Sequence, residues 1–182
     1  MKNLSRRLTI LLALLASTSL ALAQDRDQPE GQGGQDKLVQ VVRQATQRYL
    51  NVANAAPDYG PALGCVSGPD HGAMGVHYVN GNLVNGETLL PNGQLDPTKP
   101  QALIYEPQPN GEMRLVGVEY IILASALPAG AAPQVADHLM VYVATPNRYG
   151  LPGFFEMHVW AWKDNPQSPF ADWNDHVTCA HQ

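Results

Sequence analysis

The sequence predicts an α+β fold in a single domain, with one long N-terminal helix packed on a curved antiparallel β-sheet. Two observations indicate this class. Apolar residues recur at helical spacing only once, early in the chain. After that segment, short apolar runs alternate with Pro, Gly and Asn-Gly pairs, which is typical of strands joined by tight turns. We therefore expect one helix followed by a sheet.

The predicted helix begins at Asp36, a favoured N-cap residue, and ends before Pro57. Its apolar face consists of residues three and four positions apart: Leu38, Val41, Val42, Ala45, Tyr49 and Val52. A helix of about five turns with this stripe is expected to bury the stripe against the sheet.

The clearest strand pair is a hairpin in which residues 102–106 are joined to residues 113–123 through Asn110-Gly111. Asn-Gly adopts the positive φ angles that tight hairpin turns require. Further strands are expected at residues 74–79, 139–144 and 154–162.

Residues 1–23 have the three parts of a secretory signal peptide: a basic start, a short apolar run, and Ala-Leu-Ala before Gln24. The apolar run is too short for a membrane span, so we expect a periplasmic or secreted protein with no membrane insertion after signal cleavage. Residues 24–35 are rich in Gln, Gly and Asp and contain no large apolar side chain. They predict a disordered leader before a single domain at residues 36–182.

The charge of the chain argues against one class of partner. The sequence has 11 basic and 16 acidic residues, and three of the basic ones lie in the predicted signal, which leaves 8 against 16. Because nucleic-acid binding requires clustered Lys and Arg, we expect no nucleic-acid partner. A metal ion or a small molecule remains, and the oligomeric state is left open.

The chain has two cysteines, Cys65 and Cys179. In an oxidising compartment an even cysteine count predicts a disulfide. This bridge would tie the segment after the helix to the end of the chain. The alternative is that both remain free thiolates that bind a metal.

Alternation along residues 154–162 predicts where a site lies, because successive side chains of a strand point to opposite faces. One face is apolar and is expected to form core: Phe155, Met157, Val159 and Ala161. The other face has the composition of a lined pocket: Phe154, Glu156, His158, Trp160 and Trp162. His158 is the first candidate, with an ordinary half-buried histidine that bonds a neighbour as the alternative.

Two further residues complete a candidate metal site. Glu119 lies in an apolar strand, where a buried carboxylate must be paired, coordinated or protonated. His77 follows Gly-Ala-Met-Gly, and His with Glu suits zinc whereas His with Met suits copper. We therefore predict that His77, Glu119 and His158 bind copper or zinc. A surrounding ligand pocket is expected from Met74, Tyr78, Glu106, Glu156, Trp160 and Trp162, although an edge position in water also explains Glu106.

The motifs around these residues are Gly72-Ala73-Met74-Gly75-Val76-His77-Tyr78, Leu103-Ile104-Tyr105-Glu106-Pro107, Val118-Glu119 and His158-Val159-Trp160, followed by Asn165-Pro166, Phe170, Asn174, Val177 and Cys179. With this pattern the chain resembles a family of small exported bacterial proteins that has no established function. The resemblance implies that His77, Glu106, Glu119 and His158 belong to a common framework. It implies no reaction.

The leading hypothesis is an exported binding protein that holds a divalent metal ion. The first alternative is a small-molecule or glycan-binding module with a pocket lined by Trp160, Trp162 and Tyr78. The second is a hydrolase that uses Glu119 or His158 as general base. Standard catalytic signatures such as G-x-S-x-G, H-E-x-x-H and the P-loop are missing from the sequence, so catalysis and catalytic residues remain unknown.

Overall fold

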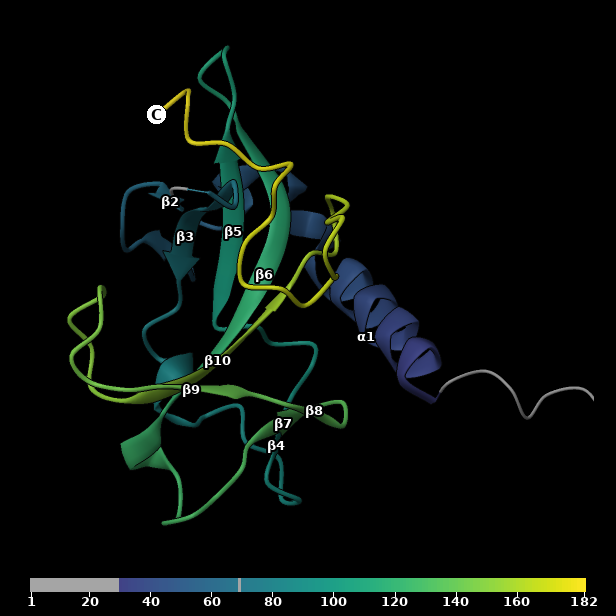
Figure 1. Cartoon of the computed structure of the whole chain (residues 1–182), viewed down its shortest axis with the longest axis vertical. Coiled ribbons are helices and arrows are strands. Elements are labelled where there is room, and N and C mark those ends of the chain that lie inside the picture. The colour runs from purple at the N-terminus through teal and green to yellow at the C-terminus, as the bar shows by residue number, and fades with distance from the viewer. Residues whose placement is uncertain (1–29, 69) are drawn as a thin grey trace, which may run out of the picture.

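The computed structural model describes residues 30–68 and 70–182 (Figure 1). The predicted signal peptide, residues 1–23, and residues 24–29 of the predicted leader lie outside the described residues. The helix α1 (Glu30–Thr46) begins inside the rest of that leader. None of the helices in the described part of the chain has the length and apolar character needed to cross a membrane.

Helix α1 is shorter at its C-terminal end than expected. It ends at Thr46 and continues as two 3₁₀ turns, η1 (Gln47–Leu50) and η2 (Val52–Asn54). The hydroxyl of Thr46 donates to the carbonyl of Val42, a local bond that competes with regular helix bonding. Because the helix begins at Glu30, Asp36 is an internal residue and the predicted N-cap is wrong.

The main sheet is antiparallel and has seven strands, with the order β1-β3-β5-β6-β10-β9 and with β2 paired to β3. Its strands are β1 (Gly60–Pro61), β2 (Val66–Ser67), β3 (Ala73–Val79), β5 (Ala102–Pro107), β6 (Met113–Leu123), β9 (Val141–Val143) and β10 (Phe154–Val159). A second sheet consists of β4 (Gln94–Leu95), β7 (Gln134–Val135) and β8 (His138–Leu139), and β4 is parallel to β7. Two further 3₁₀ turns are η3 (Leu83–Asn85) and η4 (Ala124–Ala126).

The predicted α+β class is wrong, because the described residues are mostly β-sheet and contain one short helix. The hairpin of β5 and β6 is confirmed, and Gly111 in its turn has φ +80°. We expected one long helix packed on the sheet. Its buried side chains, such as Leu38 and Val42, fill only part of a core that strand side chains otherwise supply.

The main sheet buries side chains on both faces. On one face, Leu103, Tyr105 and Tyr120 pack in the same core cluster as Leu38 and Val42 of α1. On the other face, strand residues pack against Val177 of the C-terminal segment, and this cluster contains Ala73, Ile104, Val116 and Trp160. Figure 1 shows α1 beside the sheet and the C-terminal segment, in yellow, running over β5 and β6.

The C-terminal segment is attached to the start of the sheet. The predicted Cys65–Cys179 disulfide is confirmed and joins residues 114 positions apart. Asn174 forms an antiparallel bridge with Ala73, with two backbone hydrogen bonds of 3.2 Å. Gly72 has φ +71°, and a Cβ at this position would lie 2.2 Å from the carbonyl oxygen of Asn174. Only glycine therefore allows this close approach of the two backbones.

Candidate metal centre

Strand register brings His77, Glu119 and His158 to one face of the main sheet. His158 of β10 lies directly opposite Glu119 of β6. Glu119 in turn lies opposite Ala102 of β5, which pairs with Val79 of β3, two residues beyond His77. Residues two apart in a strand share a face, so all three side chains point the same way.

The three predicted ligands form a tight buried group. Their candidate ligand atoms all lie within 4.8 Å of one another, and His77 Nε2 is 3.3 Å from Glu119 Oε2. His77, Glu119 and His158 are 5%, 4% and 0% exposed. Tetrahedral bonds of about 2.1 Å place two ligand atoms about 3.4 Å apart, so small side-chain rotations suffice to complete such a shell.

Several ring nitrogens of this group are unsatisfied. His77 Nδ1 and both nitrogens of His158 have no hydrogen-bond partner among the described residues. A buried polar atom without a partner costs about 1–3 kcal/mol, and folded proteins contain few of them. The fold thus keeps the imidazole of His158 unpaired next to the Glu119 carboxylate.

The protonation states of the group suit metal binding. Burial lowers the pKa of His158, which keeps its imidazole neutral. Burial by itself would raise the pKa of Glu119, but the interactions of its carboxylate with His158, His77 and Glu156 outweigh burial and lower the pKa. A metal ion binds neutral imidazole and ionised carboxylate, and the two pKa shifts favour these forms in His158 and Glu119.

Glu156 is a fourth buried polar residue, two positions from His158 on β10. Burial, the charge of Glu119 and a hydrogen bond with Glu119 raise the pKa of Glu156 to about 9. At neutral pH Glu156 is therefore a neutral acid beside the Glu119 carboxylate, and its Oε2 has no hydrogen-bond partner among the described residues.

Trp160 and Asp172 lie next to the His158 ring. The indole ring of Trp160 stacks on His158 with centroids 5.9 Å apart and an interplanar angle of 14°. Asp172 Oδ1 lies 3.9 Å from His158 Nδ1, beyond hydrogen-bond distance, so both ring nitrogens of His158 stay unpaired among the described residues. We did not predict Asp172, since it lies in an irregular segment where no periodicity indicates its neighbours.

A cavity of about 260 Å³ adjoins the group. His77 and Glu119 both line it, and its other walls are mainly apolar, with Val79, Val84, Ile121, Leu123, Tyr149 and Phe154 among them. Met74, which we expected near the site, does not line the cavity. It lies behind the cavity residue Tyr149, whose hydroxyl donates to the Met74 sulfur at 3.4 Å.

The structure places three of the predicted pocket residues elsewhere: Tyr78, Trp162 and Glu106. The ring of Tyr78 packs against Tyr105 with centroids 4.9 Å apart, on the helix side of the sheet. Trp162 also lies on that side, where its indole donates to the hydroxyl of Thr46 at 3.0 Å. The alternation that we extended to Trp162 stops because β10 ends at Val159.

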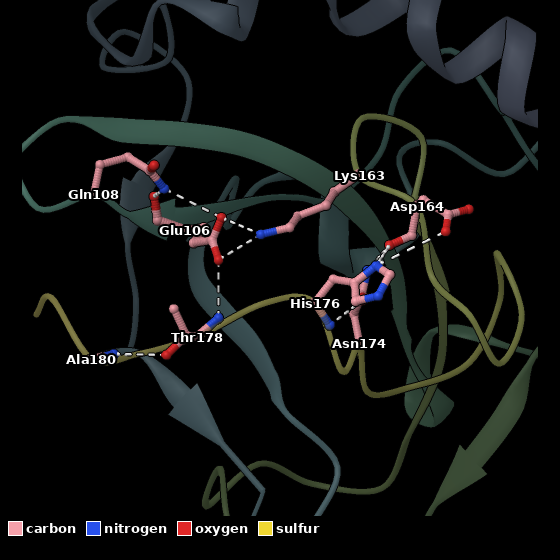
Figure 2. Close-up of polar contacts among 8 residues, drawn as sticks. All are labelled: Glu106, Gln108, Lys163, Asp164, Asn174, His176, Thr178 and Ala180. Atoms are coloured by element: carbon pink, nitrogen blue, oxygen red, sulfur yellow. Dashed lines mark hydrogen bonds and ion pairs between the residues drawn. The ribbon is translucent and has the colours of Figure 1, made fainter.

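Glu106 belongs to a different polar group, which we call the Glu106 latch: Glu106, Lys163, Gln108 and Thr178 (Figure 2). Lys163 Nζ donates to both carboxylate oxygens at 2.8 and 2.7 Å, and the backbone N–H of Thr178 donates at 3.0 Å. Gln108 supplies a further donor at 3.2 Å. Glu106 is thus buried and fully paired, and the expectation of an edge carboxylate in water is wrong.

In comparisons with known proteins, no family model, curated protein or solved structure matches this chain. The resemblance to small exported bacterial proteins therefore stays a prediction. What the chain does has to be inferred from the geometry of the His77, Glu119 and His158 group.

Proposed function

We propose that this protein binds one divalent transition-metal ion through His77, Glu119 and His158, and that the ion is zinc. The observation that carries this proposal is the buried approach of three ligand atoms within 4.8 Å, next to imidazole nitrogens that have no protein partner. Two imidazoles and one carboxylate are a donor set that zinc accepts, with a fourth position left open.

The donor types favour zinc over Cu(I). The group contains two nitrogens and one oxygen and no sulfur. The sulfur of Met74, the candidate soft ligand, instead accepts a hydrogen bond from Tyr149. Soft thioether and thiolate ligands select Cu(I), whereas a nitrogen and oxygen set also suits Cu(II) and Fe(II), which the test has to include.

A structural His–Glu ion pair explains only part of the group. Such a pair accounts for His77 Nε2 and the Glu119 carboxylate, which are 3.3 Å apart. It leaves His158 fully buried with neither ring nitrogen bonded, at a cost that a structural role does not repay. An ion bound between the three residues uses a nitrogen of each histidine.

The glycan alternative has little support from the placement of the tryptophans. Trp160 is 3% exposed, and its ring lies against His158. Trp162 is bonded to Thr46 on the opposite face of the sheet. Neither ring is presented for stacking on a sugar.

We also propose that the protein is located in an oxidising compartment, the periplasm or the medium. The Cys65–Cys179 disulfide is typical of periplasmic and secreted proteins. If the chain is exported as we propose, mass spectrometry of the protein from its host will give a mature N-terminus near Gln24, and an intact N-terminal Met1 would contradict this part.

The test is titration of tag-free protein, stripped of metal by chelation, with Zn²⁺, Cu²⁺ and, without oxygen, Fe²⁺. We expect one zinc per chain, at least 100-fold weaker binding in His77→Ala and in His158→Ala, and the weakest competition from Fe²⁺. His176→Ala is the matched control, because His176 is half exposed and lies near Asp164, outside the group.

Thermal unfolding provides an independent readout of the same titration. Zinc at 100 times its Kd should stabilise the wild-type protein by about 2.7 kcal/mol and should leave the two histidine variants unchanged. If both variants bind zinc as the wild type does, the proposal fails.

A further inference from the structure

We propose that the cavity beside His77 and Glu119 binds a small amphiphile, with an apolar tail along the cavity walls and a single anionic head group on the metal ion. This inference rests on the proposed metal site. It adds the class of ligand that the site would take.

The cavity lies next to the proposed ion, so the head group of a ligand in the cavity can reach the ion. His77 and Glu119 are ligands of the proposed ion, and both also line the cavity. Three protein donors leave the fourth position of a tetrahedral ion for an outside donor. The side of the group that faces the cavity is where an outside molecule can reach that position.

The walls of the cavity select an apolar tail. Apart from His77 and Glu119, the lining side chains are aliphatic, proline, phenylalanine or the ring of Tyr149. The Tyr149 hydroxyl already donates to the Met74 sulfur. A sugar or a peptide would leave its polar groups without partners in such a place, which costs several kcal/mol.

The volume limits the size of the ligand. A cavity of about 150 Å³ suffices for benzene, with its six carbons. The cavity here measures about 260 Å³, so it fits a molecule of about ten non-hydrogen atoms. A carboxylate with an eight-carbon chain has this size.

Charge favours an anionic head. Glu119 is the one anion among the three donors, because imidazoles bind metal in their neutral form. A divalent ion would keep one uncompensated positive charge in a buried place, and a monoanionic donor neutralises it.

The mouth of the cavity carries exposed apolar side chains. Leu63 and Leu151 line the cavity and are 39% and 40% exposed. They come from two segments far apart in the chain, one before β3 and one before β10. An apolar tail that enters here stays in contact with apolar surface along its path.

The test uses octanoate as the probe and calorimetry on the zinc-loaded protein. Acetate has the same head without the tail, and octanol has the tail without the charge. We expect octanoate to bind at least tenfold more tightly than either. We also expect at least a tenfold loss of octanoate affinity after the metal has been removed by chelation.

Variants place the binding in this cavity. Val84→Trp fills space between η3 and the cavity and should weaken octanoate at least tenfold with zinc affinity unchanged. Val141→Trp is the matched control, because Val141 is 58% exposed on β9 and lies outside the cavity. Unchanged zinc affinity also shows that the variants fold. The comparison of octanoate, acetate and octanol uses the wild-type protein and does not depend on any variant.

The outcomes separate the two proposals. If zinc binds but acetate and octanoate bind equally, the amphiphile inference is overturned and the metal site stands. Octanoate binding that survives metal removal overturns the role of the ion in holding the head group. If zinc itself does not bind, both proposals fail.

Discussion

Two buried polar groups on the main sheet differ in how far their hydrogen bonds are satisfied. In the Glu106 latch, the carboxylate accepts from Lys163, Gln108 and the backbone of Thr178. In the metal centre, both nitrogens of His158 and one of His77 have no partner in the described part of the chain. Both groups contain a buried carboxylate, so burial by itself does not distinguish them.

This difference distinguishes a structural polar group, the Glu106 latch, from a candidate binding site, the metal centre. A fully paired buried group holds two segments together, and here it joins β5 to the C-terminal segment that the Cys65–Cys179 disulfide also anchors. An unpaired buried group destabilises the fold unless a ligand completes it. Four changes test the comparison, and each affects either the latch and its disulfide or the metal centre.

The largest effect is expected from the disulfide. Removing it by Cys65→Ser with Cys179→Ser should lower the free energy of unfolding by about 4–5 kcal/mol, because the bridge closes a loop of more than a hundred residues. Urea denaturation of the variant and the wild type measures this. At urea concentrations below the unfolding transition, the variant should still bind one zinc ion per chain. Loss of zinc binding would mean that the metal centre depends on the disulfide.

Glu106→Gln should lower the free energy of unfolding by about 3 kcal/mol, since it leaves the ammonium of Lys163 without its charge partner in a largely buried place. Glu112→Gln is the control on the exposed hairpin turn, and its effect should stay within about 0.5 kcal/mol. Both are read from urea denaturation. A Glu106→Gln variant as stable as the control would contradict a stabilising role for the Glu106 latch.

The stability of the metal-free protein should fall as pH rises from 7 to 9. Burial and the charge of Glu119 raise the pKa of Glu156 to about 9 from its ordinary 4.5, so the native state holds a proton that the unfolded chain has lost. Stability then decreases by up to about 1.4 kcal/mol per pH unit. His158, whose pKa burial lowers, is neutral in both states above pH 7 and adds no opposing slope.

Thermal unfolding at several pH values in the presence of a chelator measures this slope. Glu156→Gln should flatten it, because the amide does not titrate, whereas Glu112→Gln should keep it. A wild-type protein whose stability rises between pH 7 and 9 would contradict the proposed protonation of Glu156.

The smallest effect concerns the orientation of His158. Asp172→Asn should weaken zinc binding about tenfold, about 1.4 kcal/mol, because outer carboxylates hold ligating histidines in place. Stability without metal should hardly change, since Asp172 is about half exposed. Asp175→Asn, in the same segment, is the control for calorimetric titration, and equal effects in both variants would argue against a role for Asp172.

Local patterns in the sequence predicted part of the site. Period-2 alternation placed Glu156 and His158 on the face opposite Met157 and Val159, and the structure confirms this. A carboxylate inside an apolar strand singled out Glu119. These signals work because strand geometry makes the direction of a side chain a local property.

Other residues could not be placed from the sequence. Asp172, Lys163 and Thr178 reach their partners from an irregular segment, where nothing periodic relates sequence position to direction. Trp162 lies past the end of β10 and turns to the helix side. The two-residue strands β1, β2, β4, β7 and β8 depend on the strands they pair with, since so short a run has no pattern of its own.

The amino-acid sequence alone determined the hairpin of β5 and β6, the pairing of its two cysteines, and the residue types available to a metal ion. These depend on turn chemistry, on an even cysteine count and on alternation, all of which are local or compositional. Only the tertiary structure decided that the fold is mostly β, that His77, Glu119 and His158 meet while Glu106 pairs elsewhere, and that a cavity opens beside them. Those outcomes depend on strand order and on contacts between residues far apart in the chain, which no single segment encodes.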